Sequence, residues 1–117
     1  MRIILISAHA GERSALQELL REDGHDVMAV AHRRDGVALA TSGHADAIIA
    51  DVQLPALDGV ALKRELTQGG SHSQVILLCS RPGRALEPGL VCLTKPIDLA
   101  RLHRYIPPRP AAEDRVA

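Results

Sequence analysis

The sequence contains almost no aromatic residues. Its 117 residues include one Tyr, no Trp and no Phe, although 46% of the chain is hydrophobic. A core must therefore be built from Leu, Ile, Val and Ala. The hydrophobic fraction excludes a globally disordered chain, and the length suits one domain with one core.

The sequence also lacks a surplus of either charge. Lys and Arg number 14 and Asp and Glu number 14, so the formal net charge is zero. Binding to nucleic acid or to an anionic membrane surface needs a basic surplus, so we predict neither partner. The apolar run at residues 3–6 is too short for a signal peptide, and no run approaches the length of a membrane span. We therefore expect a cytoplasmic protein.

Cysteine is scarce as well. Cys79 and Cys92 are too few and too far apart in sequence for a disulfide scaffold or a zinc knuckle. Buried cysteines that act as small hydrophobic residues are the favoured interpretation, and a redox pair is the alternative. The histidines are scattered, and we expect those other than His9, which include His25, to lie at the surface.

Short apolar runs alternate with helical patterns along the chain. This alternation predicts a parallel sheet with helices on both faces and right-handed crossovers. Residues 1–106 would form this domain, and the Pro-rich, charged residues 107–117 are expected to be a disordered tail. The expected strands are 2–7, 26–30, 47–51, 74–79 and 90–94, and the expected helices are 11–23, 35–42, 59–68 with Asp58 as its cap, at most one turn at 84–87, and 97–106.

The most informative stretch is ADAIIADVQLPALDG, residues 45–59. An apolar run ends there in Asp51, and turn residues follow before the next helical pattern. The carboxyl end of such a strand is where open α/β sheets keep their ligand crevice. Lys95 follows another strand and ends at the same edge, so we predict that Asp51 and Lys95 share a site. The alternative is a structural carboxylate that caps a loop and pairs with Lys95.

Two segments resemble those of response-regulator receiver domains, the CheY-like phospho-acceptor family of two-component signalling. IIADVQLPALDG resembles the family's strand-Asp-x-x-x-Pro-x-x-x-Gly segment, and LTKPID resembles its Lys-Pro segment. The resemblance runs over residues 2–106. It implies an α/β, flavodoxin-like, doubly wound sheet of five parallel strands in the order 2-1-3-4-5, and a cis peptide bond before Pro96. It also implies that Asp51 accepts a phosphoryl group and that Lys95 pairs with this group.

The chain departs from the family where the family binds Mg²⁺. Two adjacent acidic residues follow the first strand in the family, whereas this chain has Ser7 and Ala8, followed by His9. Mg²⁺ prefers oxygen ligands, so Asp51 is left as the one acidic ligand, and we expect Mg²⁺ to bind weakly or not at all. No other cofactor is expected. His9 beside Asp51 would supply a second ligand only, so we expect it to be an exposed loop residue.

The residues that change conformation in the family are replaced too. The family has a Ser or Thr at the end of the fourth strand and an aromatic residue in the fifth. Here Cys79, followed by Ser80, and Cys92 stand at these switch positions. The segment between Cys79 and Lys95 is shorter than in the family, which predicts a shortened or missing fourth helix.

Three functions are compatible with these residues. The first is an atypical receiver, or pseudo-receiver, that acts as a protein-interaction module in a phosphorelay and is not an enzyme, with weak or absent Mg²⁺-dependent phosphorylation of Asp51. The second is a functional phospho-acceptor. The third is a small flavodoxin-like ligand binder or enzyme, although no glycine-rich phosphate loop follows the first strand. Expected partners are a histidine kinase, a phosphotransfer domain or an output protein, and a homodimer is left open.

Overall fold

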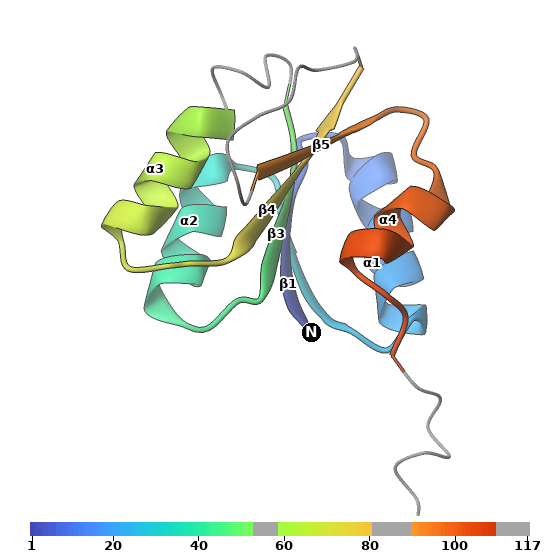
Figure 1. Ribbon diagram of the computed structural model, residues 1–117, viewed down its shortest axis with the longest axis horizontal. Coiled ribbons are helices and arrows are strands. Elements are labelled where there is room, and N and C mark those ends of the chain that lie inside the picture. The colour runs from blue at the N-terminus through green and yellow to red at the C-terminus, as the bar shows by residue number, and fades with distance from the viewer. Residues whose placement is uncertain (53–58, 81–89, 110–117) are drawn as a thin grey trace, which may run out of the picture.

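The computed structural model of the chain describes residues 1–52, 59–80 and 90–109. The strands form one parallel sheet in the order β2-β1-β3-β4-β5 (Figure 1). This arrangement confirms the doubly wound, flavodoxin-like fold predicted from the sequence. The elements are β1 (Arg2–Ile6), α1 (Ala10–Glu22), β2 (Asp26–Val30), α2 (Arg33–Ser42), β3 (Ala47–Asp51), α3 (Val60–Gln68), β4 (Gln74–Cys79), β5 (Leu90–Thr94) and α4 (Leu99–Tyr105).

Most predicted boundaries agree with the structure to within two residues. The last helix begins at Leu99 rather than at residue 97, because the Asp98 side chain accepts a hydrogen bond from the Ala100 backbone N–H at 2.9 Å and caps it. Three expectations fall outside the described residues: the Asp58 cap, the helical turn at 84–87, and the shortened or missing fourth helix.

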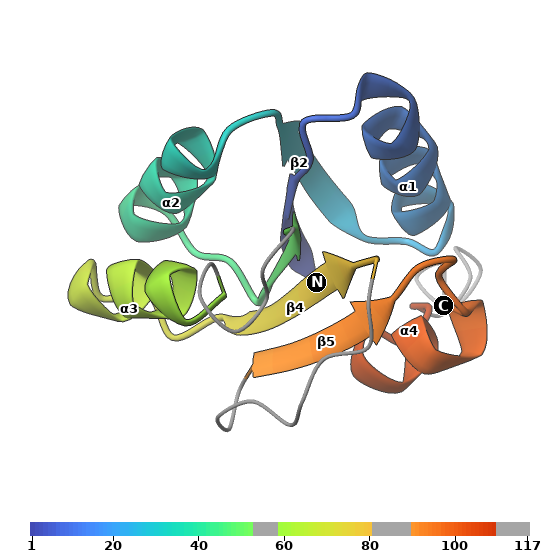
Figure 2. The same cartoon turned by 90° about the horizontal axis from the view of Figure 1, so that it is seen from above.

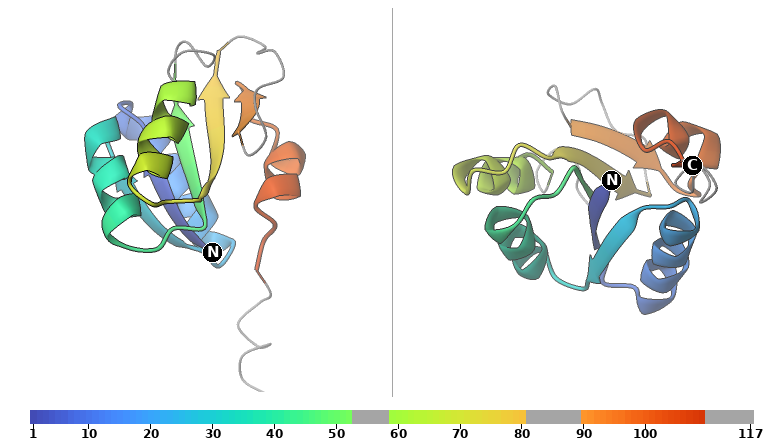
Figure 3. Two further views of the ribbon diagram at one scale, coloured as in Figure 1. Left: turned by 60° about the vertical axis from the view of Figure 1, so that its left-hand side comes forward. Right: turned by 90° about the horizontal axis from the view of Figure 1, so that it is seen from below.

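In the part of the chain that the structure describes, two helices cover each face of the sheet. Figures 2 and 3 show α2 and α3 on one face and α1 and α4 on the other. Because side chains alternate along a strand, β3 supplies Ile49 to the core under α1 and α4, and Ile48 to the core under α2 and α3. Both side chains are fully buried. The buried hydrophobic residues are Ile, Leu, Val and Ala together with Cys79, as the scarcity of aromatics predicted.

The turn after α1 depends on a glycine. Gly24 has a φ of 93°, the left-handed conformation that a Cβ disfavours. The N–H of Gly24 donates to the carbonyl of Arg21, and the N–H of His25 donates to the carbonyl of Leu20. These bonds end the helix and return the chain to β2 beside β1.

His25 is buried, so the expectation of a surface position is wrong for this histidine. Its exposed fraction is 5%. The ring Nδ1 lies 3.1 Å from the amino group of Met1, and Nε2 lies 3.1 Å from the carbonyl oxygen of Pro107. The Arg109 N–H also donates to the Asp23 carbonyl at 2.7 Å. The first residues of the predicted tail, 107–109, therefore pack against the α1–β2 turn, and residues 110–117 lie outside the described part of the chain.

The environment of His25 predicts that the fold weakens in mild acid. Burial, followed by the nearby amino terminus, lowers the pKa of His25 below its ordinary value of 6.5, although the Pro107 carbonyl partly offsets this. The unfolded chain then binds a proton that the folded chain resists, so stability falls as pH drops below about 6.5. Replacing His25 by Gln should flatten the decline of the melting temperature between about pH 7.5 and 5.5.

Thermal denaturation across this pH range measures the effect. The exposed His32 at the start of α2 offers a matched control, because His32→Gln should keep the wild-type decline. An unchanged decline in His25→Gln would show that other groups cause the acid sensitivity.

Candidate functional site

The carboxyl ends of the strands bring the predicted site residues to one edge of the sheet. Asp51 is the last residue of β3, and Lys95 directly follows β5. β4 lies between these strands and ends at Cys79, whose carbonyl accepts a hydrogen bond from the Lys95 N–H at 2.7 Å. The Lys95–Pro96 peptide bond is cis, as the resemblance implied.

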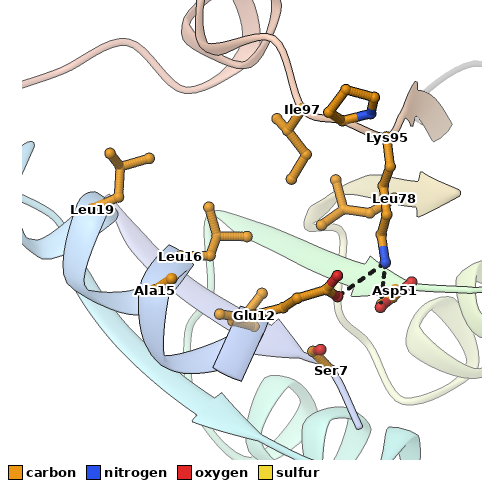
Figure 4. A pocket seen from close by; sticks show the side chains of 11 residues that line it. Ser7, Glu12, Ala15, Leu16, Leu19, Asp51, Leu78, Lys95 and Ile97 are labelled. Atoms are coloured by element: carbon orange, nitrogen blue, oxygen red, sulfur yellow. Dashed lines mark hydrogen bonds and ion pairs between the residues drawn. The ribbon is translucent and has the colours of Figure 1, made fainter. Parts of the chain in front are cut away.

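Lys95 joins two carboxylates. Its Nζ lies 2.8 Å from Asp51 Oδ2 and 3.1 Å from Glu12 Oε2 (Figure 4). The side chains of Asp51 and Lys95 are 14% and 23% exposed, so this pair is largely shielded from solvent, whereas the Glu12 side chain is 58% exposed. The predicted proximity of Asp51 and Lys95 is therefore confirmed, and we call these three residues the Lys95 cluster.

The sequence analysis did not predict Glu12. The residue lies in the first turn of α1, three positions after His9, and reaches Lys95 from the helix that follows β1. The spacing of three residues between His9 and Glu12 was the signal that could have placed Glu12 beside the site. Residues three apart lie on the same side of a helix. An acidic residue at this helix position is also favoured by the helix dipole.

The electrostatics of the Lys95 cluster favour its ionised form. Burial lowers the pKa of Lys95, but the hydrogen bonds and charges of Asp51 and Glu12 outweigh this effect and raise it above 10.5. The hydrogen bond from Lys95 is the main cause that lowers the pKa of Glu12 below 4.5. Two carboxylates share one ammonium, so the cluster carries an excess of one negative charge.

The polar groups of Ser7, in the loop after β1, form hydrogen bonds with nearby residues of the chain. Ser7 is buried, its carbonyl accepts a hydrogen bond from Arg13 Nη1 at 2.7 Å, and its hydroxyl accepts one from the His9 N–H at 3.3 Å. Ala8 and His9 are exposed. His9, Glu12 and Asp51 each place one potential ligand atom within 4.8 Å of the others. The structure thus brings His9 and Asp51 together with Glu12.

Residues 3–107 match the response regulator receiver domain family. The chain belongs to this family. Among curated relatives, the receiver is 31% identical to Protein PilH of Pseudomonas aeruginosa over 63% of this chain and 61% of PilH. It is 32% identical to the transcriptional regulatory protein PcoR of Escherichia coli, over 86% of this chain and 47% of PcoR. The receiver therefore spans less than two thirds of the length of these relatives.

Solved structures agree with this assignment. The receiver domain of the hybrid histidine kinase CckA is 27% identical, with a TM-score of 0.73 over 91% of this chain and 95% of that chain. A response regulator receiver domain protein from Clostridium thermocellum is 25% identical, with a TM-score of 0.76 over 90% of each chain. Among the helices of the described residues, none is long and apolar enough to cross a membrane.

The residues of this receiver do not fit Mg²⁺ as the family holds it. Ser7 and Ala8 replace the acidic pair. The carboxylates of Glu12 and Asp51 already contact the Lys95 ammonium. His9 offers a nitrogen, whereas Mg²⁺ prefers oxygen ligands in a near-octahedral arrangement. Each carboxylate has a second oxygen that Lys95 does not contact, so a dication here would share both carboxylates with the Lys95 ammonium, which repels it.

The two cysteines form a disulfide, so the interpretation of Cys79 and Cys92 as separate hydrophobic residues is wrong. The pairing cannot be seen from the separation of the two cysteines in the sequence, because it depends on strand register. The register of β4 and β5 places Cys79 opposite Thr94 and Cys92 opposite Leu77. The cysteines therefore lie on the same face of neighbouring strands, with their Cα atoms 6.9 Å apart. The alternative interpretation, a redox pair, fits this position. Ser80, the third predicted switch position, is exposed.

A cavity of about 370 Å³ opens beside the Lys95 cluster. Leu16 and Leu19 of α1 form one wall, and Leu78 and Ile97 form the other (Figure 4). The cavity is within the size range of small-ligand sites, and it ends at charged groups. This is the feature that the ligand-binder hypothesis would use.

The shared ammonium predicts that two single substitutions have unequal effects on stability. Asp51→Asn leaves Lys95 paired with Glu12 and removes the excess negative charge, so the free energy of unfolding should stay within about 1 kcal/mol of wild type or rise. Lys95→Gln leaves two carboxylates without a cation and should cost about 1–3 kcal/mol.

Chemical denaturation measures both differences. The double variant Asp51→Asn/Lys95→Gln should recover part of the stability lost in Lys95→Gln, because it removes the repulsion between carboxylates. A larger loss in Asp51→Asn than in Lys95→Gln would indicate a purely structural Asp51.

Glu12, like Asp51, should contribute to the raised pKa of Lys95. Removing its charge in Glu12→Gln should lower the pKa of Lys95, since burial then acts against one carboxylate instead of two. Lys63 and Lys95 are the only lysines of the chain, so NMR titration of the side-chain Cε signals reports each of them separately.

Lys63 serves as the internal reference in this titration. Glu18→Gln is the matched control, because Glu18 is an exposed residue of the same helix. An equal change of the Lys95 pKa in both variants would contradict a specific Glu12–Lys95 contact.

Proposed function

We propose that this receiver acts as a protein-interaction module in two-component signalling, and that Asp51 is phosphorylated weakly or not at all with Mg²⁺. The observation that carries this proposal is the Lys95 cluster, in which one ammonium is shared by Asp51 and Glu12. The absence of acidic side chains at Ser7 and Ala8 supports it. The family supports a signalling role in which the chain catalyses no reaction on a substrate of its own.

Charge is the physical reason for weak phosphorylation. Phosphoryl transfer depends mainly on positioning and on stabilisation of negative charge. Phosphoryl transfer converts the Asp51 carboxylate, with one negative charge, into an acyl phosphate with up to about two, so the excess negative charge of the cluster rises from one to about two. Lys95 would have to leave Glu12 to neutralise the incoming group, and no second cationic side chain is hydrogen-bonded to Asp51 in the described residues. The site therefore holds the Asp51 carboxylate paired with a cation that Glu12 already shares.

The partner in this proposal is a protein. Receiver domains interact with histidine kinases and other proteins of a phosphorelay, and a histidine kinase, a phosphotransfer domain or an output protein would fit here. The net charge of zero does not favour nucleic acid. We place this interaction in the cytoplasm, where two-component phosphorelays operate, and residues 1–106 would form the interacting domain.

A functional phospho-acceptor is the second candidate. It is favoured by the 2.8 Å contact between Lys95 Nζ and Asp51, which would pre-position the cation beside the acceptor oxygen. The two candidates make opposite predictions about labelling with a phosphodonor.

Intact mass after incubation with acetyl phosphate distinguishes them. The proposal predicts no phosphoryl adduct, or a small fraction of one, with or without Mg²⁺, under conditions that label an ordinary receiver fully. Asp51→Asn is the negative control. A substantial adduct that requires both Mg²⁺ and Asp51 would establish the functional phospho-acceptor instead.

A gain-of-function variant tests whether the missing acidic pair causes the weak phosphorylation. Ser7→Asp/Ala8→Asp supplies the acidic pair that the family has after its first strand, and this variant should gain Mg²⁺-dependent labelling at Asp51. Labelling that remains absent in a folded variant would show that the missing acidic pair does not explain the weak phosphorylation.

A further inference from the structure

The disulfide joins Cys79 and Cys92, the two positions where the resemblance to receiver domains implies switch residues. Cys79 ends β4 and Cys92 is the third residue of β5. We propose that Cys79 and Cys92 form a reversible thiol–disulfide switch that controls how firmly β5, and with it Lys95, is held at the edge of the sheet. This inference does not require Asp51 to be phosphorylated.

The geometry permits the bond to form within the native sheet. The two cysteines lie on one face of neighbouring strands, and the pairing register fixes their separation before any bond exists. Their exposures differ, because Cys79 is 1% exposed and Cys92 is partly exposed. An external thiol or disulfide would therefore react first at Cys92, and Cys79 would act as the resolving thiol.

The position of the bond links it to the Lys95 cluster. Among the described residues, β5 is the last strand in the sheet order, so β4 is its one strand neighbour. Lys95 lies three residues after Cys92, and its N–H donates to the carbonyl of Cys79 itself. The disulfide joins the end of β4 to the middle of β5, and the hydrogen bond joins the same residue of β4 to the residue that follows β5. Opening the disulfide leaves hydrogen bonds and packing to hold β5 at this end.

The chemistry balances with a low-molecular-weight disulfide such as oxidised glutathione as the oxidant. The Cys92 thiolate attacks one sulfur of glutathione disulfide, forms a mixed disulfide and expels one glutathione thiolate. The Cys79 thiolate then attacks the Cys92 sulfur and expels the second. Two protein thiols lose two electrons and two protons, and one glutathione disulfide becomes two glutathione thiols. An external dithiol reverses the reaction.

Redox titration tests whether the switch exists. The protein is equilibrated in buffers with graded ratios of reduced and oxidised glutathione, quenched with acid and analysed by intact mass. We expect a form that is lighter by two hydrogen atoms, which interconverts fully and reversibly with the dithiol. Cys79→Ser should stop at the mixed disulfide on Cys92. A wild-type protein that also stops there, or that stays a dithiol at every ratio, overturns the proposal.

Hydrogen exchange tests the link to Lys95. Reduction should speed exchange of the Lys95 amide by about tenfold or more, while the Ile49 amide in the centre of the sheet stays unchanged. Cys92→Ser should exchange like the reduced wild type, and Cys92→Ala replaces it if the Ser variant does not fold. Equal exchange rates of the Lys95 amide in the oxidised and reduced proteins would overturn the proposal, because they would show that the disulfide does not control how firmly β5 is held.

Discussion

The ammonium group of Lys95 is the interaction on which the site depends. It is held between Asp51 and Glu12, which come from β3 and α1. One cation shared by two carboxylates offsets one of their two negative charges and leaves an excess of one. In the proposed function, the same contacts occupy the ammonium that would otherwise stabilise a phosphoryl group. The site is thus built from the residues of a receiver, and its one cation is already paired within the chain.

The fold explains why these groups meet. Parallel strands all point the same way, so the residues that end β3, β4 and β5 share one edge of the sheet. Strand β4 separates Asp51 from Lys95, and its last carbonyl fixes the backbone of Lys95. The core that supports this edge is aliphatic, with Ile48 and Ile49 of β3 buried on opposite faces. Packing on both faces therefore positions β3, and the charges come from the end of β3, the first turn of α1 and the residue after β5.

Local patterns in the sequence predicted the parallel α/β sheet and the Asp51–Lys95 pair, because apolar runs and strand ends are visible in one dimension. The strand order was implied by the resemblance to receiver domains. Glu12, the cysteine pair and the burial of His25 were not predicted, because each depends on tertiary geometry. Glu12 reaches Lys95 only through the placement of α1, Cys79 meets Cys92 only through strand register, and His25 is buried only when residues 107–109 return to it.

The central claim is that the Lys95 ammonium, paired with both carboxylates, repels a divalent cation from the site. The most direct measurement is the Mg²⁺ affinity of the wild type and of Lys95→Met, followed by NMR titration of amides at the ends of β1, β3 and β5. We expect no saturable binding to the wild type at millimolar Mg²⁺, and saturable binding once Lys95 is removed. Saturable binding to the wild type with the same affinity in Lys95→Met would contradict this claim.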